Sequence, residues 1–178
     1  MKPIERLSRE LSYRGAVIDV YTDTVRVPNG TVAKWDFIGH VGAAAVVPVL
    51  DDGRILMVRQ YRNALDRFTL ELPAGKLDAA GEPMIECAAR ELEEETGYRS
   101  DDLTPLITLN TTVAFCNEKI GIYVARNLQK THQNLDADEE IEVEACELEE
   151  LLAKIFAQEM TDSKTVAALL AYHALSER

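Results

Sequence analysis

The stretch that decides the fold is the acidic run Arg90-Glu91-Leu92-Glu93-Glu94-Glu95-Thr96-Gly97-Tyr98. On a helix, Glu91, Glu94 and Glu95 lie three and four positions apart, so their carboxylates share one face. Pro83 is typical of a first helical turn. Gly97 stands where a C-terminal glycine cap belongs. The pattern therefore predicts a helix from about residue 83 to residue 96, with a buried face formed by Ile85, Ala88, Ala89 and Leu92.

The acidic face of this helix destabilises the helix by itself. Like charges at this spacing repel by a few tenths of a kcal/mol per pair. Carboxylates in the last turn also oppose the helix macrodipole, at roughly 0.3–1 kcal/mol each. A bound cation would offset both effects, and carboxylate oxygens favour Mg²⁺ or Mn²⁺. The alternative is a solvated acidic face, the usual explanation of Glu-rich helices. Here the acids gather at the unfavourable end and follow a glycine loop, which favours metal binding.

The segment from Gly75 to Tyr98 resembles the Nudix box. That signature has a glycine, five residues, a glutamate, seven residues, and then Arg-Glu-apolar-x-Glu-Glu-x-Gly-apolar. In this chain six residues separate Gly75 from Glu82. The extra residue falls around Ala79-Ala80, in a loop, which absorbs it more easily than a helix. Every position from Glu82 onward keeps the spacing of the signature.

The resemblance implies a fold and a metal site. The fold is α/β, the Nudix α/β/α sandwich with a mixed sheet. The cofactor is Mg²⁺, with Mn²⁺ possible. The implied metal ligands are the carboxylates of Glu91, Glu94 and Glu95 and the backbone carbonyl of Ala74. The implied structural support of the box comes from Gly75, Glu82, Arg90 and Gly97.

Two further stretches, 58–62 and 71–78, resemble the ADP-ribose pyrophosphatase subgroup. This resemblance implies hydrolysis of the diphosphate bond of a nucleoside diphosphate sugar, with ADP-ribose giving AMP and ribose 5-phosphate. One alternative is another nucleotide sugar such as GDP-mannose. The other is a non-catalytic regulator that senses ADP-ribose. The complete set of box glutamates favours an enzyme.

Substrate contacts are expected from Arg59, Arg62, Glu71 and Trp35. A guanidinium suits a diphosphate because it can bind two oxygens at once. Strand alternation turns Arg59 and Arg62 to opposite faces, and the resemblance favours Arg62. Arg59 is equally explained as an edge arginine paired with an acid. Trp35 either stacks on the nucleotide base or packs in a core.

The base that activates water is expected in the acidic stretch 138–143, which resembles the catalytic loop of the subgroup. Alignment on Ile141 favours Glu139, with Glu140 second. Glu94 joins them in the catalytic set. A solvated acidic loop is the alternative.

Residues 1–40 are expected to form a small antiparallel β element, and residues 41–178 are expected to form the Nudix domain. The resemblance implies that the N-terminal element forms a dimer interface. Strands at 16–27 and 31–38 flank Asn29-Gly30, which predicts a two-residue hairpin turn. The apolar runs 43–50 and 55–58 predict paired strands buried on both faces. Further strands are expected at 106–114, 120–125 and 141–145, with a loop at 129–138. Two helices are expected near 148–155 and 165–175, the second capped by Asp162 or Ser163, with Lys164 as a surface charge.

The bulk composition limits the partners. The chain has 178 residues, one domain's length, and a formal net charge of −12. Such a charge disfavours nucleic acid and anionic membranes. No apolar run is long enough to span a membrane, and the N-terminus does not resemble a signal peptide. The spacing of Cys87, Cys116 and Cys146 predicts reduced, buried thiols. We expect a cytoplasmic homodimer that acts on a small molecule.

Overall fold

The computed structural model describes residues 2–16, 18–79 and 81–176, which form two compact units. The first unit comprises Met1–Gly42 and Asn110–Lys119, and the second comprises Ala43–Leu109 and Ile120–Arg178. The sequence did not indicate that residues 110–119 belong with the N-terminal strands. Backbone hydrogen bonds explain it, because the Ile38 N–H donates to the Phe115 carbonyl over 2.7 Å.

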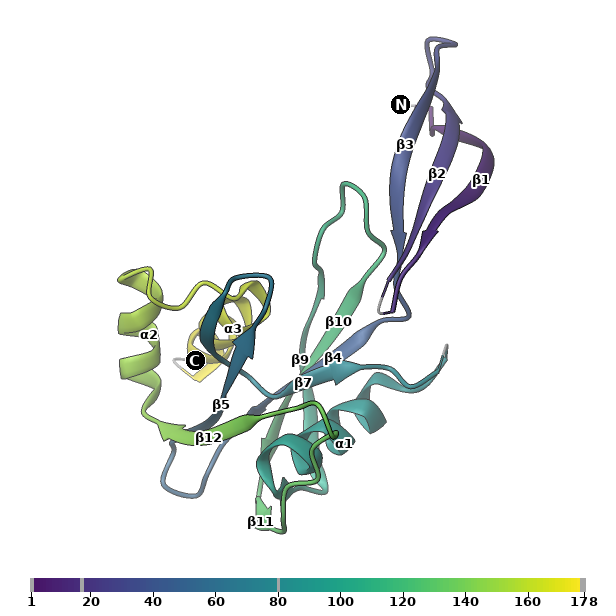
Figure 1. Ribbon diagram of the computed structural model, residues 1–178. Helices are drawn as coiled ribbons and strands as arrows, with labels where there is room; N and C mark the ends of the chain where they lie inside the picture. The colour runs from purple at the N-terminus through teal and green to yellow at the C-terminus, as the bar shows by residue number, and fades with distance from the viewer. Residues whose placement is uncertain (1, 17, 80, 177–178) are drawn as a thin grey trace. The chain divides into compact units, whose positions relative to one another are not determined.

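The first unit contains an antiparallel sheet in the order β1-β2-β3 (Figure 1). Its strands are β1 (Glu5–Arg14), β2 (Asp19–Arg26) and β3 (Val32–Gly39). Strand β1 was not predicted, because it is exposed at every position except the half-buried Arg9 and so buries no apolar face. The predicted hairpin is confirmed by the antiparallel pairing of β2 with β3, but its two-residue turn was wrong. The Gly30 N–H donates to the Val27 carbonyl over 2.8 Å, and Gly30 alone in that turn has a positive φ, of 92°. A type I′ turn needs two such residues.

The second unit is built on a mixed four-stranded sheet in the order β7-β4-β10-β9. Its strands are β4 (Ala43–Pro48), β7 (Ala74–Lys76), β9 (Asp102–Asn110) and β10 (Lys119–Arg126). Strand β10 runs parallel to β4, and β7 runs antiparallel to it. The predicted strand at 106–114 is therefore shifted toward the N-terminus, because its last residues belong to the first unit.

A second, antiparallel sheet has the order β12-β5-β6, with β5 (Ile55–Arg62), β6 (Arg67–Glu71) and β12 (Ile141–Cys146). The expected pairing of the runs 43–50 and 55–58 was wrong. Within the described chain, they are joined by the isolated bridge between Val49 and Ile55, while β5 pairs with β6 and β12. Residues 43–48 and 55–58 are fully buried as expected, whereas Val49 and Leu50 are half-buried. A strand buried on both faces carries no periodicity that reveals its neighbours.

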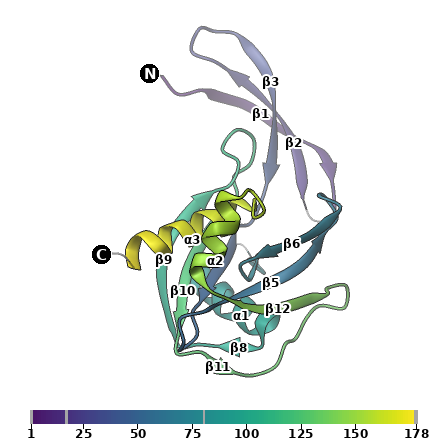
Figure 2. The same cartoon turned by 90° about the vertical axis from the view of Figure 1, so that its left-hand side faces the viewer.

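The core has two halves, one on each face of β4. Ala43, Ala45 and Val47 pack with α2 (Leu148–Phe156) and α3 (Ser163–Ser176). Ala44 and Val46 pack with α1 (Met84–Thr96). Helices α2 and α3 also contact each other (Figure 2). Alternate side chains of β4 thus pack against helices on opposite faces of the sheet. This confirms the predicted α/β/α sandwich. A two-stranded ribbon of β8 (Tyr98–Arg99) and β11 (Gln129–Lys130) completes the unit.

Some predicted burial was wrong. Ile85 on α1 is 41% exposed, and Cys87 takes its place on the buried face. Cys116 and Cys146 are partly exposed. None of the described helices is both long and apolar enough to cross a membrane.

Candidate active site on helix α1

Helix α1 carries the acidic run and is fixed at both ends. Pro83 precedes it with an extended backbone, and Gly97 ends it with a φ of 70°. The Gly97 N–H donates to the Glu93 carbonyl over 2.9 Å, as the glycine cap predicted. Cys87, Ala88 and Leu92 bury one side of the helix. Glu95 is buried with them, whereas Glu91 and Glu94 are half-buried.

The Glu91 carboxylate packs directly on Gly75. A β-carbon at position 75 would approach the carboxylate carbon and both carboxylate oxygens of Glu91 closer than the 3.0 Å that real β-carbon contacts respect. A side chain at position 75 would therefore displace the Glu91 carboxylate from this place. Gly75 lies in β7, opposite Ala44 of β4, so the sheet holds the glycine that seats the carboxylate.

Arg90 links the carboxylates of the box. Its Nη1 donates to Glu91 over 2.6 Å and to Glu94 over 2.9 Å, and its Nη2 lies 3.8 Å from Glu82. Glu82 in turn accepts a hydrogen bond from the Asp78 N–H over 2.6 Å. Burial acts to lower the pKa of Arg90, but Glu91 and Glu94 outweigh it and raise the pKa. Through Glu82, Arg90 ties the helix to the preceding loop. Gly81 in that loop has a φ of 95°. Ala80, which belongs to the expected insertion, lies outside the described residues.

Glu95 is the buried member of the set, only 5% exposed. Its Oε2 accepts a hydrogen bond from the Ala74 N–H over 2.9 Å. Burial raises the pKa of Glu95 to about 8, although the Ala74 hydrogen bond opposes the shift and Glu91 and Glu139 add to it. Burial likewise raises the pKa of Glu91, although Arg90 opposes that shift. Burial therefore disfavours the charged form of both carboxylates.

The donor set fits a divalent cation. Among the described residues, no three Asp, Glu, His or Cys side chains are gathered tightly enough to form a metal cluster. The carboxylates of the three box glutamates are instead hydrogen-bonded to Arg90 and to the Ala74 N–H. Three carboxylates on one helix face, two of them with raised pKa values, are the hard oxygen ligands that Mg²⁺ and Mn²⁺ prefer.

The loop with the base candidates is tied to the end of α1. The Thr131 N–H donates to the Gly97 carbonyl, and the Asn134 N–H to the Glu94 carbonyl. The Gln133 amide donates to the Glu95 carbonyl over 2.7 Å and to the Ile141 carbonyl over 3.4 Å. These bonds supply donors to carbonyls that a helix end leaves free. Gln133 was not singled out in the sequence, because an isolated glutamine in a polar loop carries no pattern.

Of the two base candidates, Glu139 interacts electrostatically with the helix carboxylates. Its charge acts on both Glu91 and Glu95. Its own N–H donates to the Asp136 carbonyl over 3.0 Å, which fixes a turn just before β12. Glu140 is exposed beside it.

Arg62 belongs to a second cluster near Glu95. Its Nε and Nη2 donate to the two oxygens of Glu71 over 2.8 and 2.7 Å. Burial acts to raise the pKa of Glu71, but Arg62 and Lys164 outweigh it and lower the pKa to about 2. The expectation that Lys164 is a surface charge was wrong, since its side chain is 12% exposed and pairs with Glu71 and Asp162. Its position just after a helix cap concealed the contact with a residue 93 positions away.

Arg59 faces away from this cluster, as strand alternation predicted. Its Nε donates to Glu144 of the neighbouring strand β12. Arg59 is thus an arginine paired with an acid across the sheet, the alternative explanation for it.

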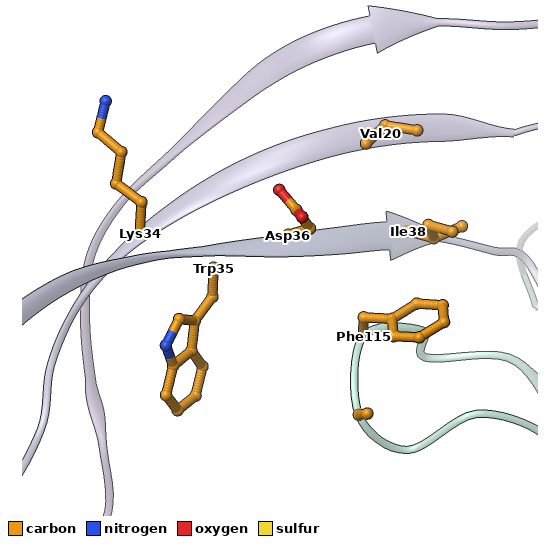
Figure 3. Close-up of a pocket in the computed structure, with 7 residues that line it drawn as sticks. Val20, Lys34, Trp35, Asp36, Ile38 and Phe115 are labelled. Atoms are coloured by element: carbon orange, nitrogen blue, oxygen red, sulfur yellow. The ribbon is translucent and has the colours of Figure 1, made fainter.

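Trp35 lies in the first unit, on β3, and is 45% exposed. It borders a hollow of about 540 Å³ lined by Val20, Lys34, Trp35, Asp36, Ile38, Ala114 and Phe115. Figure 3 shows the Trp35 and Phe115 rings on one side of β3, with Lys34 and Asp36 pointing to the other side. Trp35 is therefore not a core residue within this unit.

The chain is similar to known proteins over most of its length. The profile of the NUDIX domain matches residues 39–169. An ADP-ribose pyrophosphatase of Bacillus subtilis (strain 168) is 39% identical over 95% of this chain and 93% of its own length. A methanol dehydrogenase activator of Bacillus methanolicus is 38% identical over 92% and 89%. A crystal structure of an ADP compounds hydrolase has the same fold, with a TM-score of 0.88 at 23% identity, covering 99% of this chain and 96% of that one.

The chain therefore belongs to the Nudix family, and it is a pyrophosphohydrolase of that family. Within the family it resembles the ADP-ribose pyrophosphatases over nearly its whole length, so both predictions from the box and its flanking stretches are confirmed.

Proposed function

We propose that this protein catalyses the Mg²⁺-dependent hydrolysis of the diphosphate bond of nucleoside diphosphate sugars, with ADP-ribose as the preferred substrate. The observation that carries the proposal is the single helix face with Glu91, Glu94 and Glu95, to whose end the loop of Glu139 is tied. The likeness to the ADP-ribose pyrophosphatase of Bacillus subtilis supports ADP-ribose over GDP-mannose.

Four groups are suited to hold the cation: the carboxylates of Glu91, Glu94 and Glu95 and the carbonyl of Ala74. Ala74 qualifies because Glu95 is hydrogen-bonded to the N–H of the same residue. Once bound, a divalent cation neutralises phosphate charge and acidifies a coordinated water. Gly75, Glu82, Arg90 and Gly97 keep the carboxylates in place.

The chain's own residues supply the remaining steps. Arg62 uses Nε and Nη2 for Glu71, which leaves Nη1 for a phosphate oxygen. Glu139 accepts the proton of the attacking water, with Glu140 as the second candidate. The water oxygen bonds to one phosphorus as that phosphorus loses its bond to the bridging oxygen. ADP-ribose then yields AMP and ribose 5-phosphate, with no covalent bond to the enzyme.

We propose that the hollow beside Trp35 and Phe115 receives the base. Two aromatic rings on one side of β3 offer flat apolar faces on which a base can stack (Figure 3). Trp35 is the only tryptophan, so its fluorescence reports on this hollow. Addition of AMP should quench the emission, whereas unchanged emission at saturating AMP would remove Trp35 from the base site.

We propose that the protein works in the cytoplasm as a homodimer joined through its N-terminal β element. Exposed large apolar side chains on that element support this: Ile4, Leu7, Leu11, Tyr13, Val32 and Trp35. Apolar side chains that form one contiguous surface mark protein interfaces. Light scattering should give twice the chain mass of 19.8 kDa, and a mass of one chain would contradict the dimer.

Hydrolysis of a panel of nucleotide sugars and nucleoside triphosphates, with Mg²⁺ or with EDTA, tests the substrate class. ADP-ribose should be cleaved fastest, and only with metal. Faster cleavage of GDP-mannose would support the proposed diphosphate hydrolysis but contradict ADP-ribose as the preferred substrate. If no compound is cleaved, the alternative of a non-catalytic regulator is favoured. The likeness to a methanol dehydrogenase activator supports that alternative.

A further inference from the structure

Lys164 shares a carboxylate partner, Glu71, with Arg62. Its Nζ donates to Glu71 and, over 2.9 Å, to Asp162. Glu71 accepts two bonds from Arg62 on the same carboxylate, together with one from the Thr69 hydroxyl over 2.6 Å. The side chain of Glu71 is only 4% exposed. One carboxylate is therefore shared between two cations from strand β5 and helix α3.

The start of α3 is built to present this lysine. Asp162 Oδ2 accepts the Thr165 N–H over 3.0 Å and so caps the helix. The buried Thr165 hydroxyl accepts the Leu72 N–H over 2.9 Å. That bond fixes α3 to the residue directly after Glu71, so the lysine is held at this carboxylate by the backbone on both sides.

The charges of this cluster balance, since Arg62 and Lys164 face Glu71 and Asp162. Stability alone is a weak reason for such an arrangement, because apolar residues of the same volume often stabilise a protein as well as a buried ion pair does. Without Lys164, Arg62 would face two carboxylates and would no longer offer its charge to an anion.

We propose that Lys164 is a positioning residue that neutralises Glu71 and Asp162, so that Arg62 keeps its positive charge for the substrate diphosphate. This rests on the proposed function, which makes a diphosphate the ligand. Lys164 acts through its neighbours and need not touch the substrate.

The test compares wild type, Lys164→Met and the double variant Lys164→Met/Asp162→Asn. Asparagine still caps a helix, and the double variant has again one cation and one anion. Lys154→Met is the matched control, because Lys154 lies on α2 with a side chain 46% exposed. The readouts are KM and kcat for ADP-ribose with Mg²⁺, the calorimetric affinity for inorganic diphosphate in EDTA, and Tm.

Lys164→Met should weaken diphosphate binding and raise KM by about tenfold, the effect of one uncompensated charge at short range. The double variant should recover most of both losses, and Lys154→Met should match wild type. A purely structural lysine would instead lower Tm further in the double variant, without recovery of affinity, and would overturn the proposal. Unchanged affinity and KM in Lys164→Met would also overturn it. If wild type cleaves no nucleotide sugar but the diphosphate affinities follow this order, the proposed function fails and the role of Lys164 stands.

Discussion

The carboxylate of Glu91 occupies the space that a side chain at Gly75 would need. The two residues come from α1 and β7, which pack against each other in the second unit. The glycine and the glutamate of the box therefore form one contact, in which the sheet fixes the position of a metal-ligand candidate.

Gly75→Ala should displace the Glu91 carboxylate, because the added β-carbon overlaps it. A shift of about 1 Å in a catalytic group lowers activity by roughly 100-fold. Steady-state hydrolysis of ADP-ribose measures the effect. Gly39→Ala is the control, since the atom nearest to its β-carbon would be a Tyr21 ring atom at 3.2 Å. Equal activity of the two variants would show that the contact does not position Glu91.

The raised pKa of Glu95, about 8, predicts the pH dependence of stability in EDTA. Between its ordinary pKa and 8, the folded state binds more protons than the unfolded state. The stabilisation from protonated Glu95 is therefore complete at low pH and is lost as the pH rises through 8. Thermal unfolding from pH 5.5 to 8.5 should show this decline, and Glu95→Gln should flatten it. Mg²⁺ should stabilise wild type most at high pH, because ligands must be deprotonated. Identical pH profiles of wild type and Glu95→Gln would contradict this account.

Glu71→Gln should be strongly destabilising, because it leaves Lys164 without its buried partner. Removal of one member of a buried pair costs about 3–5 kcal/mol. Glu144→Gln is a matched control on β12 of the same sheet, where the Arg59 pair is more than a third exposed. An exposed pair contributes about 0–1 kcal/mol. Urea unfolding gives both free energies of unfolding. A loss for Glu71→Gln no larger than that of the control would show that the cluster contributes little to stability.

Gln133→Leu should loosen the loop of Glu139, because the Gln133 amide bridges the Glu95 and Ile141 carbonyls. The backbone hydrogen bonds of Thr131 and Asn134 to the end of α1 remain in the variant. We expect kcat to fall by about tenfold or more, since the base loses its fixed place, with KM little changed. Hydrogen exchange over residues 131–140 should accelerate in the variant. Gln129→Leu, which removes a bond to the exposed Arg99, serves as control. Slow exchange and normal kcat in Gln133→Leu would remove the bridge from the mechanism.

Local chemistry made helix α1 and its end at Gly97 predictable. The spacing of Glu91, Glu94 and Glu95 gave their common face, and a glycine cap has a local cause. The pairing of β5 was not predictable, because a fully buried strand carries no alternation. Lys164 and Gln133 were missed for a different reason. Each acts through partners brought close only by tertiary structure, and neither lies in a repeating pattern.

Hydrolysis of ADP-ribose by wild type and Glu91→Gln, with Mg²⁺ and with EDTA, tests the central claim most directly. Glu86→Gln, in the first turn of the same helix, is the matched control. We predict AMP and ribose 5-phosphate from wild type and Glu86→Gln with Mg²⁺, none in EDTA, and a loss of at least about 100-fold in Glu91→Gln, on the scale of a lost electrostatic contribution to the transition state. Undiminished hydrolysis by Glu91→Gln, or equal hydrolysis in EDTA, would contradict a metal-dependent site on this helix.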